Sequence, residues 1–219
     1  MAKAQVSALL SDLRGSVGGE VIILTRSGLA ARRKPRYHYP ANPSVQAGND
    51  RMRQATAAWN TLSAAQFEAW CAYAETITHQ NSVTGKGYHP APKNVFVGLS
   101  MKFLQVNPGS PVPLNPTIAS YLGDSLTVSA TAISGGIRFI ASGPNGVDSA
   151  TELMIQPLAN ARCKPTKFYK HGTFHAFSVG SLAYDLSLEP GVYALACQFV
   201  RPSTGQTAGM RTIGTVEVG

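Results

Sequence analysis

The stretch "GVYALACQFVR" at residues 191–201 decides the fold of the C-terminal half of this chain. It has the alternation that is typical of a central strand in an antiparallel sheet. Six further strand-like segments share this half, and turn sequences such as Gly-Pro-Asn-Gly and Pro-Gly separate them. Seven short strands at this spacing predict an Ig-like β-sandwich over residues 117–219. The other six segments are residues 125–133, 137–142, 151–158, 173–179, 183–188 and 211–218.

Two details refine the predicted sandwich. Tyr193 follows Pro190-Gly191, near where a sandwich of this kind keeps a corner tyrosine. The cysteine spacing of an immunoglobulin is absent, because the three cysteines are scattered along the chain without a CxxC pair. We therefore expect buried, reduced thiols rather than a disulfide framework or a zinc knuckle. The cysteines are Cys71, Cys163 and Cys197.

Residues 42–106 have the pattern of three helices. Pro43 and Ser44 favour a helix start, and Ser63 with Gln66 forms a capping box at the next one. The first two helices are so close in sequence that an antiparallel helical hairpin is expected. The predicted helical core is Trp59, Leu62, Phe67 and Trp70, with Met52, Ala55, Cys71 and Ala74 on the same apolar stripes and Val95, Leu99 and Phe103 on the third helix.

The Pro-rich stretch "NPGSPVPLNP" separates the helices from the predicted sandwich. Its four prolines stop any helix and favour a semi-rigid linker. The sequence thus predicts an α+β, multidomain chain. Its expected parts are an extended basic arm with a β-hairpin at 1–41, a helical domain at 42–106, the linker at 107–116 and an Ig-like sandwich at 117–219.

The N-terminal arm concentrates the positive charge of the chain. Residues 1–60 contain nine lysine or arginine residues and three acidic ones, and the whole chain has a net charge of +8. Within the arm, "GEVIILTRSGLAARRKP" predicts two strands around a turn near Arg26-Ser27-Gly28. Two strands alone are marginally stable in water, so this hairpin needs a surface to lie on, its own or a neighbour's.

No catalytic or cofactor motif occurs in the sequence. GxSxG, GxxxxGK[ST] and GxGxxG are all missing. His171 and His175 in "HGTFH" resemble a metal pair, but on a strand they would share a face roughly 13 Å apart, too far for one ion. We therefore expect no enzyme, no metal site and no cofactor. No apolar run is long enough for a membrane helix, and we expect no signal peptide.

The basic arm admits three interpretations. Its cations and tyrosines could pair with carboxylates on a neighbouring protein, or bind phosphates and stack on bases of a nucleic acid. The third is a basic loop solvated on the protein's own surface. We favour the protein interface, since no sequence-reading nucleic-acid motif accompanies the arm. The predicted interface residues are Arg26, Arg32, Arg33, Lys34, Arg36, Tyr37 and Tyr39.

Residues 13–75 also carry an ordered set of motifs: "LRGSVGG", an arginine-rich turn, an Asn-Pro helix start and "W…L…Q…AW..YA". This order resembles an uncharacterised family encoded in bacteriophages and prophages, whose members tend to end in a β domain. The chain departs from it at "EVIILTR", where an aromatic and an arginine are common. The matching positions are Gly15, Ser16, Gly18, Gly19, Arg26, Arg32, Pro40, Asn42, Pro43, Gln46, Arg51, Trp59, Leu62, Gln66, Trp70, Tyr73 and Ala74.

The resemblance implies a structural component of a virion, made in the bacterial host cytoplasm and present in multiple copies. The implied partners are other virion proteins of the capsid, neck or tail. A minor head or cement-like capsid component is the expectation, because a basic extended arm suits stapling acidic shell subunits. The alternatives are a nucleic-acid-binding accessory protein of the phage, and a tail or neck component with a receptor-binding sandwich.

Overall fold

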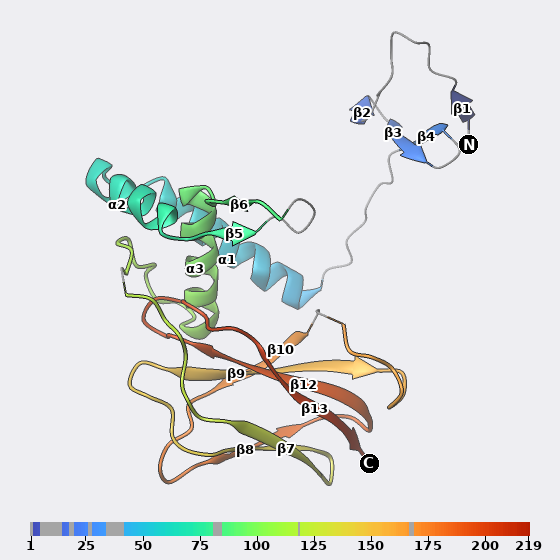
Figure 1. Ribbon diagram of the computed structural model, residues 1–219, viewed down its shortest axis with the longest axis vertical. Helices are drawn as coiled ribbons and strands as arrows, with labels where there is room; N and C mark the ends of the chain where they lie inside the picture. Colours follow the sequence, from blue (N-terminus) through green and yellow to red (C-terminus); the bar gives the residue numbers. More distant parts are fainter. Residues whose placement is uncertain are drawn as a thin grey trace. The chain divides into compact units, whose positions relative to one another are not determined.

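A computed structural model describes residues 2–4, 15–17, 20–25, 28–33, 42–80, 85–117, 119–166 and 169–219. The chain divides into two compact units, Met1–Val45 and Gln46–Gly219 (Figure 1). Helices and antiparallel sheets are both present, so the predicted α+β class is confirmed. The predicted boundaries at residues 41, 106 and 116 stay predictions.

The N-terminal unit contains a four-stranded antiparallel sheet. Its two central strands form the predicted hairpin, in which Thr25 pairs with Gly28. A three-residue strand pairs with each edge of the hairpin, so strands of the same chain extend it into a four-stranded sheet. These two strands were not predicted, because three residues are too few to show a period of two. In spatial order the strands are β1 (Ala2–Ala4), β4 (Gly28–Arg33), β3 (Glu20–Thr25) and β2 (Gly15–Val17).

The three predicted helices are present: α1 (Pro43–Trp59), α2 (Ala64–Glu75) and α3 (Pro92–Val106). The capping box of α2 forms as predicted. The backbone N–H of Gln66 donates to Ser63 Oγ at 3.3 Å, and that of Ser63 donates to Gln66 Oε1 at 2.9 Å. A short hairpin of β5 (His79–Gln80) and β6 (Gly87–Tyr88) connects α2 to α3.

The C-terminal part forms two antiparallel sheets. Each of the seven predicted strand segments overlaps one strand of these sheets, although β10 begins and ends before the predicted segment 173–179 does. Leu153, Leu195 and Phe199 of the larger sheet share one core with Ile137 and Phe139 of the smaller sheet. The larger sheet has the order β10 (Lys170–His175), β9 (Ala150–Leu158), β12 (Gly191–Val200), β13 (Arg211–Val218); the smaller has the order β11 (Ala183–Ser187), β8 (Gly136–Ala141), β7 (Val128–Ile133).

Tyr193 forms a specific backbone contact at the start of β12. The hydroxyl of Tyr193 on β12 donates to the carbonyl oxygen of Glu189 at 2.9 Å. Tyr193 also packs against the core that the two sheets share. The bond therefore fixes the start of β12 to the turn before it.

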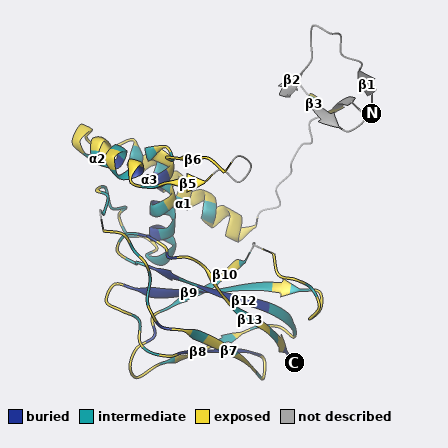
Figure 2. Ribbon diagram, in the orientation of Figure 1, coloured by how far each residue is buried: buried dark blue, intermediate teal, exposed yellow. Residues whose placement is uncertain are grey.

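Helix α3 contacts the outer face of the larger sheet, and Figure 2 shows that β9 and β12 are among the most buried strands. Asn107, which follows α3, donates from Nδ2 to the carbonyl of Pro202 at 2.7 Å. The Pro-rich segment is also attached to the helices, since the indole nitrogen of Trp70 donates to the carbonyl of Leu114 at 2.8 Å. Val112 packs on the same helical cluster as Trp70. The predicted linker is thus held against the helices rather than being a free spacer.

We predict that Gly205→Ala weakens the packing of α3 on the sheets. Gly205 has φ +75°, and a Cβ there would meet the carbonyl oxygen of Leu99 and lie 2.7 Å from the backbone nitrogen of Phe103. Left-handed strain and overpacking together should lower the free energy of unfolding by about 2–4 kcal/mol. Urea unfolding measures the change. Gly209→Ala is the matched control, because a Cβ there has open space; equal stability of the two variants would contradict the prediction.

Candidate protein-binding surface

The N-terminal sheet exposes two of the predicted interface residues. Arg32 and Arg33 are exposed at the end of β4, where they lie opposite Val21 and Glu20 of β3. Successive residues of a strand point to opposite faces, so the sheet carries one arginine on each face. The other predicted interface residues lie outside the described residues: Arg26, Lys34, Arg36, Tyr37 and Tyr39.

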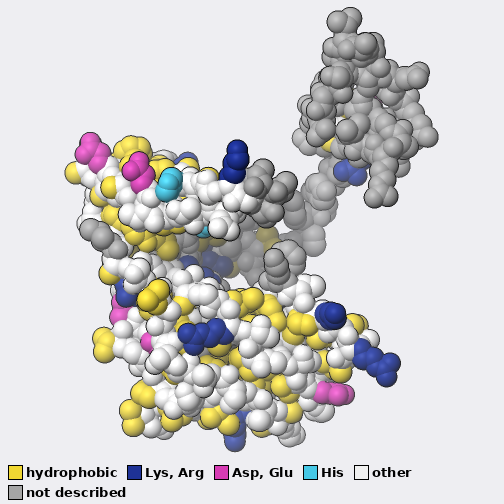
Figure 3. All heavy atoms as spheres, viewed as in Figure 1, with side chains coloured by type: hydrophobic (Ala, Val, Ile, Leu, Met, Phe, Trp, Pro, Cys, Tyr) yellow, Lys and Arg dark blue, Asp and Glu magenta, His cyan; other side chains and the backbone are white. Residues whose placement is uncertain are grey.

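The two units differ in charge. Residues 1–45 contain seven lysine or arginine residues against two acidic ones, and residues 46–219 contain twelve against nine. On the face shown in Figure 3, the basic side chains of residues 46–219 are scattered among hydrophobic and neutral ones. The concentrated positive charge therefore belongs to the N-terminal unit.

An aromatic cluster holds the helices together. Phe96 of α3 is fully buried, with its ring centroid 5.4 Å from that of Trp59 and 5.0 Å from that of Trp70. The two tryptophans lie near each other, because both contact the same phenylalanine. Leu62 packs at the edge of this cluster.

Two residues of the predicted apolar stripes lie at the surface instead. Phe67 is 47% exposed and contacts Trp59 edge to face, at 5.6 Å between ring centroids. Met52 is 53% exposed. Both expectations of burial were wrong, because helical periodicity indicates an apolar face but not what covers it.

No protein-family model, curated protein or solved structure matches this chain. The candidate site therefore depends on its own geometry. Among the described helices, none is both long and apolar enough to cross a membrane.

A buried ion cluster joins the helices to the sheets. The carboxylate of Glu152 on β9 has a side chain only 2% exposed, and it faces α3. Lys102 of α3 donates from Nζ to both of its oxygens, at 3.1 and 2.9 Å. His171 Nδ1 lies 2.9 Å from Oε1, and the Lys102 ammonium lies 5.7 Å from the ring centre of Phe174. Sequence reasoning missed this cluster, although a charged residue inside the apolar strand segment "TELMIQPL" was a signal for it.

The partners of Glu152 keep it ionised. Burial by itself would raise the pKa of this carboxyl group. The hydrogen bond with His171 and the charge and hydrogen bonds of Lys102 outweigh burial, so the pKa of Glu152 lies below its ordinary value. The cluster is therefore a stabilising tie between α3 and β9 at neutral pH.

The two histidines of "HGTFH" point to opposite faces of the larger sheet. His171 bonds Glu152 on the helix side, whereas His175 stacks on Tyr184 and Phe177 of the shared core, at 4.5 and 4.7 Å between ring centroids. The expectation that they share a face was wrong, because a β-bulge between His171 and Thr173 shifts the alternation. In the described part of the chain, no group of three His, Cys, Asp or Glu residues could hold a metal ion.

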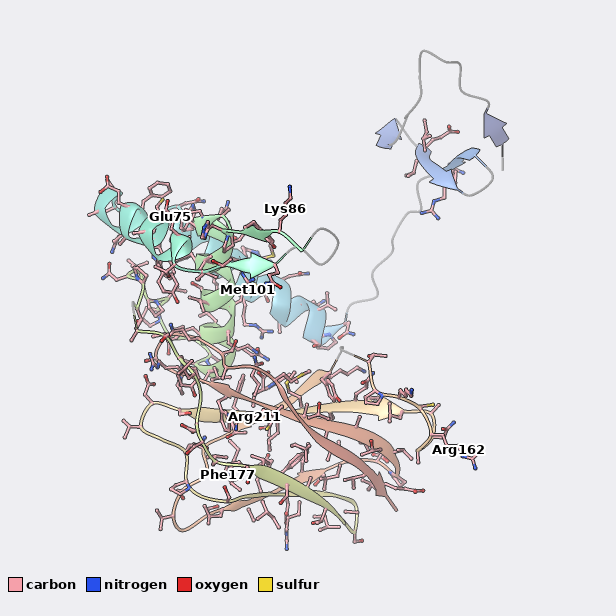
Figure 4. The ribbon with its side chains drawn as sticks, viewed as in Figure 1. Glu75, Lys86, Met101, Arg162, Phe177 and Arg211 are labelled. Carbon is pink, nitrogen blue, oxygen red and sulfur yellow. The ribbon has the colours of Figure 1, made fainter. Side chains whose placement is uncertain are left out.

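The cleft beside α3 has polar side chains that already have partners. Gln206 donates from Nε2 to the carbonyl of Ala119 at 3.0 Å and to the Tyr73 hydroxyl at 3.1 Å. The hydroxyl of Tyr121 lies 2.6 Å from that of Ser149. The bond from Gln206 to Tyr73 of α2, like Lys102, connects the helices to the C-terminal part, so the cleft serves internal packing. Arg211 donates hydrogen bonds to the backbone carbonyls of Asp124 and Leu126. Figure 4 shows Arg211 and the core residue Phe177 in the C-terminal part.

We predict that Glu152→Gln lowers the free energy of unfolding by about 1–3 kcal/mol at pH 7, since charge-assisted hydrogen bonds are lost. The depressed pKa of Glu152 stabilises the fold above the ordinary value of 4.5, and this contribution is lost as the pH falls below it. Between about pH 5 and pH 3, the stability of the original chain should therefore fall more steeply with decreasing pH than the stability of the variant. Chemical unfolding across that range measures the slopes, with exposed Glu217→Gln as the control. Parallel curves for the two variants would rule out the stabilising role.

Proposed function

We propose that this chain is a non-enzymatic structural protein of a bacteriophage particle, which binds neighbouring subunits through its N-terminal unit. The observation that carries the proposal is the concentration of positive charge in the small N-terminal unit, Met1–Val45. Surface charge of one sign attracts and orients an oppositely charged partner. The motifs of residues 13–75, which resemble a phage and prophage family, supply the biological setting.

The sheet suits an acidic protein surface. Arg32 and Arg33 are exposed on its two faces, and a guanidinium group pairs with carboxylates through two parallel hydrogen bonds. A sheet with one arginine on each face can lie between two subunits and pair with both. This arrangement agrees with a minor or cement-like capsid component.

The C-terminal sheets agree with an Ig-like sandwich at 117–219. Two antiparallel sheets share a core, and the Tyr193 hydroxyl bonds back to a carbonyl four residues upstream, as corner tyrosines do. In the proposed role, the unit that carries this sandwich is presented by the docked arm.

The first experiment is mass spectrometry of purified particles after a high-salt wash, with copy number. We expect retention at a copy number that matches the symmetry of the shell, neck or tail. Absence from particles, with recovery on DNA from infected cells, would overturn the proposal in favour of a phosphate partner. Such binding would show a log-log salt slope of several units.

We predict that Arg32→Glu with Arg33→Glu lowers incorporation into particles by about tenfold or more, through charge repulsion at the interface. The melting temperature of the unit Gln46–Gly219 should barely change, because both substitutions lie in the other compact unit. Arg162→Glu with Lys164→Glu makes the same change of charge on an exposed loop, where Arg162 projects outward (Figure 4). Quantitative mass spectrometry compares the two variants, and equal incorporation would contradict the prediction.

A chain lacking residues 1–41 provides a second test. Its helices and C-terminal sheets should unfold at nearly the original temperature, since Gln46–Gly219 forms its own compact unit. Its incorporation into particles should be lost. Normal incorporation of this truncation would remove the arm from the proposed function.

A further inference from the structure

Helix α1 carries an apolar stripe that only its C-terminal end buries. Val45, Gly48, Met52, Ala55 and Trp59 are spaced alternately by three and four residues, which places them on one face of the helix. Ala55 is fully buried, and Trp59 packs on the aromatic cluster. Val45 and Met52, on the same stripe, are 47% and 53% exposed. The stripe therefore continues past the surface that covers it.

The N-terminal half of α1 has little packing within the described chain. Ala55 is the one residue of this 17-residue helix that is buried, and Figure 2 shows α1 exposed over most of its length. An isolated helical segment of fewer than about 12–15 residues is marginal in water, because helices gain most of their stability from packing an apolar face. A partner surface would supply this packing.

Gly48 lies at the middle of the exposed stripe. A Cβ at this position would have no atom of the described chain within 4 Å, so the space beside it is open. Glycine weakens a helix interior and is suited to a close approach by another backbone. A groove that receives the stripe could come nearest to α1 at Gly48.

The charge beside the stripe selects the kind of partner. Arg51 flanks Met52, and Arg53 pairs with Asp50 at 3.0 Å. A symmetric antiparallel contact between two copies of α1, centred on Gly48, would set Arg51 against the apolar Val45 of the other copy and leave its guanidinium group without a carboxylate. The helix also follows directly on the basic N-terminal unit. A surface rimmed by carboxylates complements both.

We propose that the N-terminal half of α1 is a docking helix, whose stripe of Val45, Gly48 and Met52 enters an apolar groove with an acidic rim on a neighbouring protein subunit. The inference rests on the proposed function and extends the interface from the arm into the helical part. It assigns apolar contact to α1, while the arm supplies charge.

The test uses particles assembled without this protein, to which the purified full chain is added. Val45→Gln with Met52→Gln makes the stripe polar without changing the charge, and we expect binding to the particles to weaken about tenfold or more. Ala47→Gln with Ala57→Gln is the matched control on the opposite, exposed face of α1, and it should bind like the original chain. Circular dichroism and the melting temperature check that both variants fold.

The outcomes separate this inference from the proposed function. If the variant with Arg32→Glu and Arg33→Glu binds weakly while the Val45 and Met52 variant binds normally, the docking helix is overturned and the arm stands. If the original chain does not bind, both fail.

Two further results would name a different occupant of the stripe. Dimers of the free chain that dissociate on Val45→Gln with Met52→Gln, seen by sedimentation, would mean that a second copy covers α1. Slow hydrogen exchange of residues 46–54 in the free monomer, lost on deleting residues 1–41, would mean that the chain's own arm covers it. Fast exchange that becomes slow on the particle supports the docking helix.

Discussion

The ion cluster at Glu152 is the contact on which the arrangement of residues 46–219 depends. A carboxylate that is 2% exposed needs partners, and α3 provides Lys102 while the neighbouring strand β10 provides His171. The same partners therefore satisfy a buried charge and attach a helix to a sheet. Removing any of the three would leave a charge uncompensated or a helix less firmly held. The hydrogen bonds from Asn107 to Pro202 and from Gln206 to Tyr73 add to this attachment.

The elements with long periodic patterns were predictable from the sequence. The capping box of Ser63 and Gln66 marked the start of α2, and the alternation in "GVYALACQFVR" marked the central strand β12. The ion cluster was not predictable, because Lys102 and His171 lie 50 and 19 residues away from Glu152 and only the tertiary fold brings them together. The bulge in β10 reversed the expected facing of His175 for a similar reason, since one extra residue leaves no trace in composition.

The candidate binding surface was predictable in charge and less so in shape. Clustering of arginines predicted the basic arm, and Arg32 and Arg33 are exposed as expected. Burial of Met52 and Phe67 was predicted from helical periodicity, which reports an apolar face but not what covers it. The proposed docking helix follows from that difference between pattern and burial.

The bulge in β10 has a consequence for the free edge of the larger sheet. β10 is an edge strand of the larger sheet, and its outer backbone groups resemble a template for a strand of another chain. A bulge interrupts the regular spacing of those groups and increases the local twist. A strand of another molecule is thereby hindered from extending the sheet. The irregular strand thus protects this edge against intermolecular strand pairing.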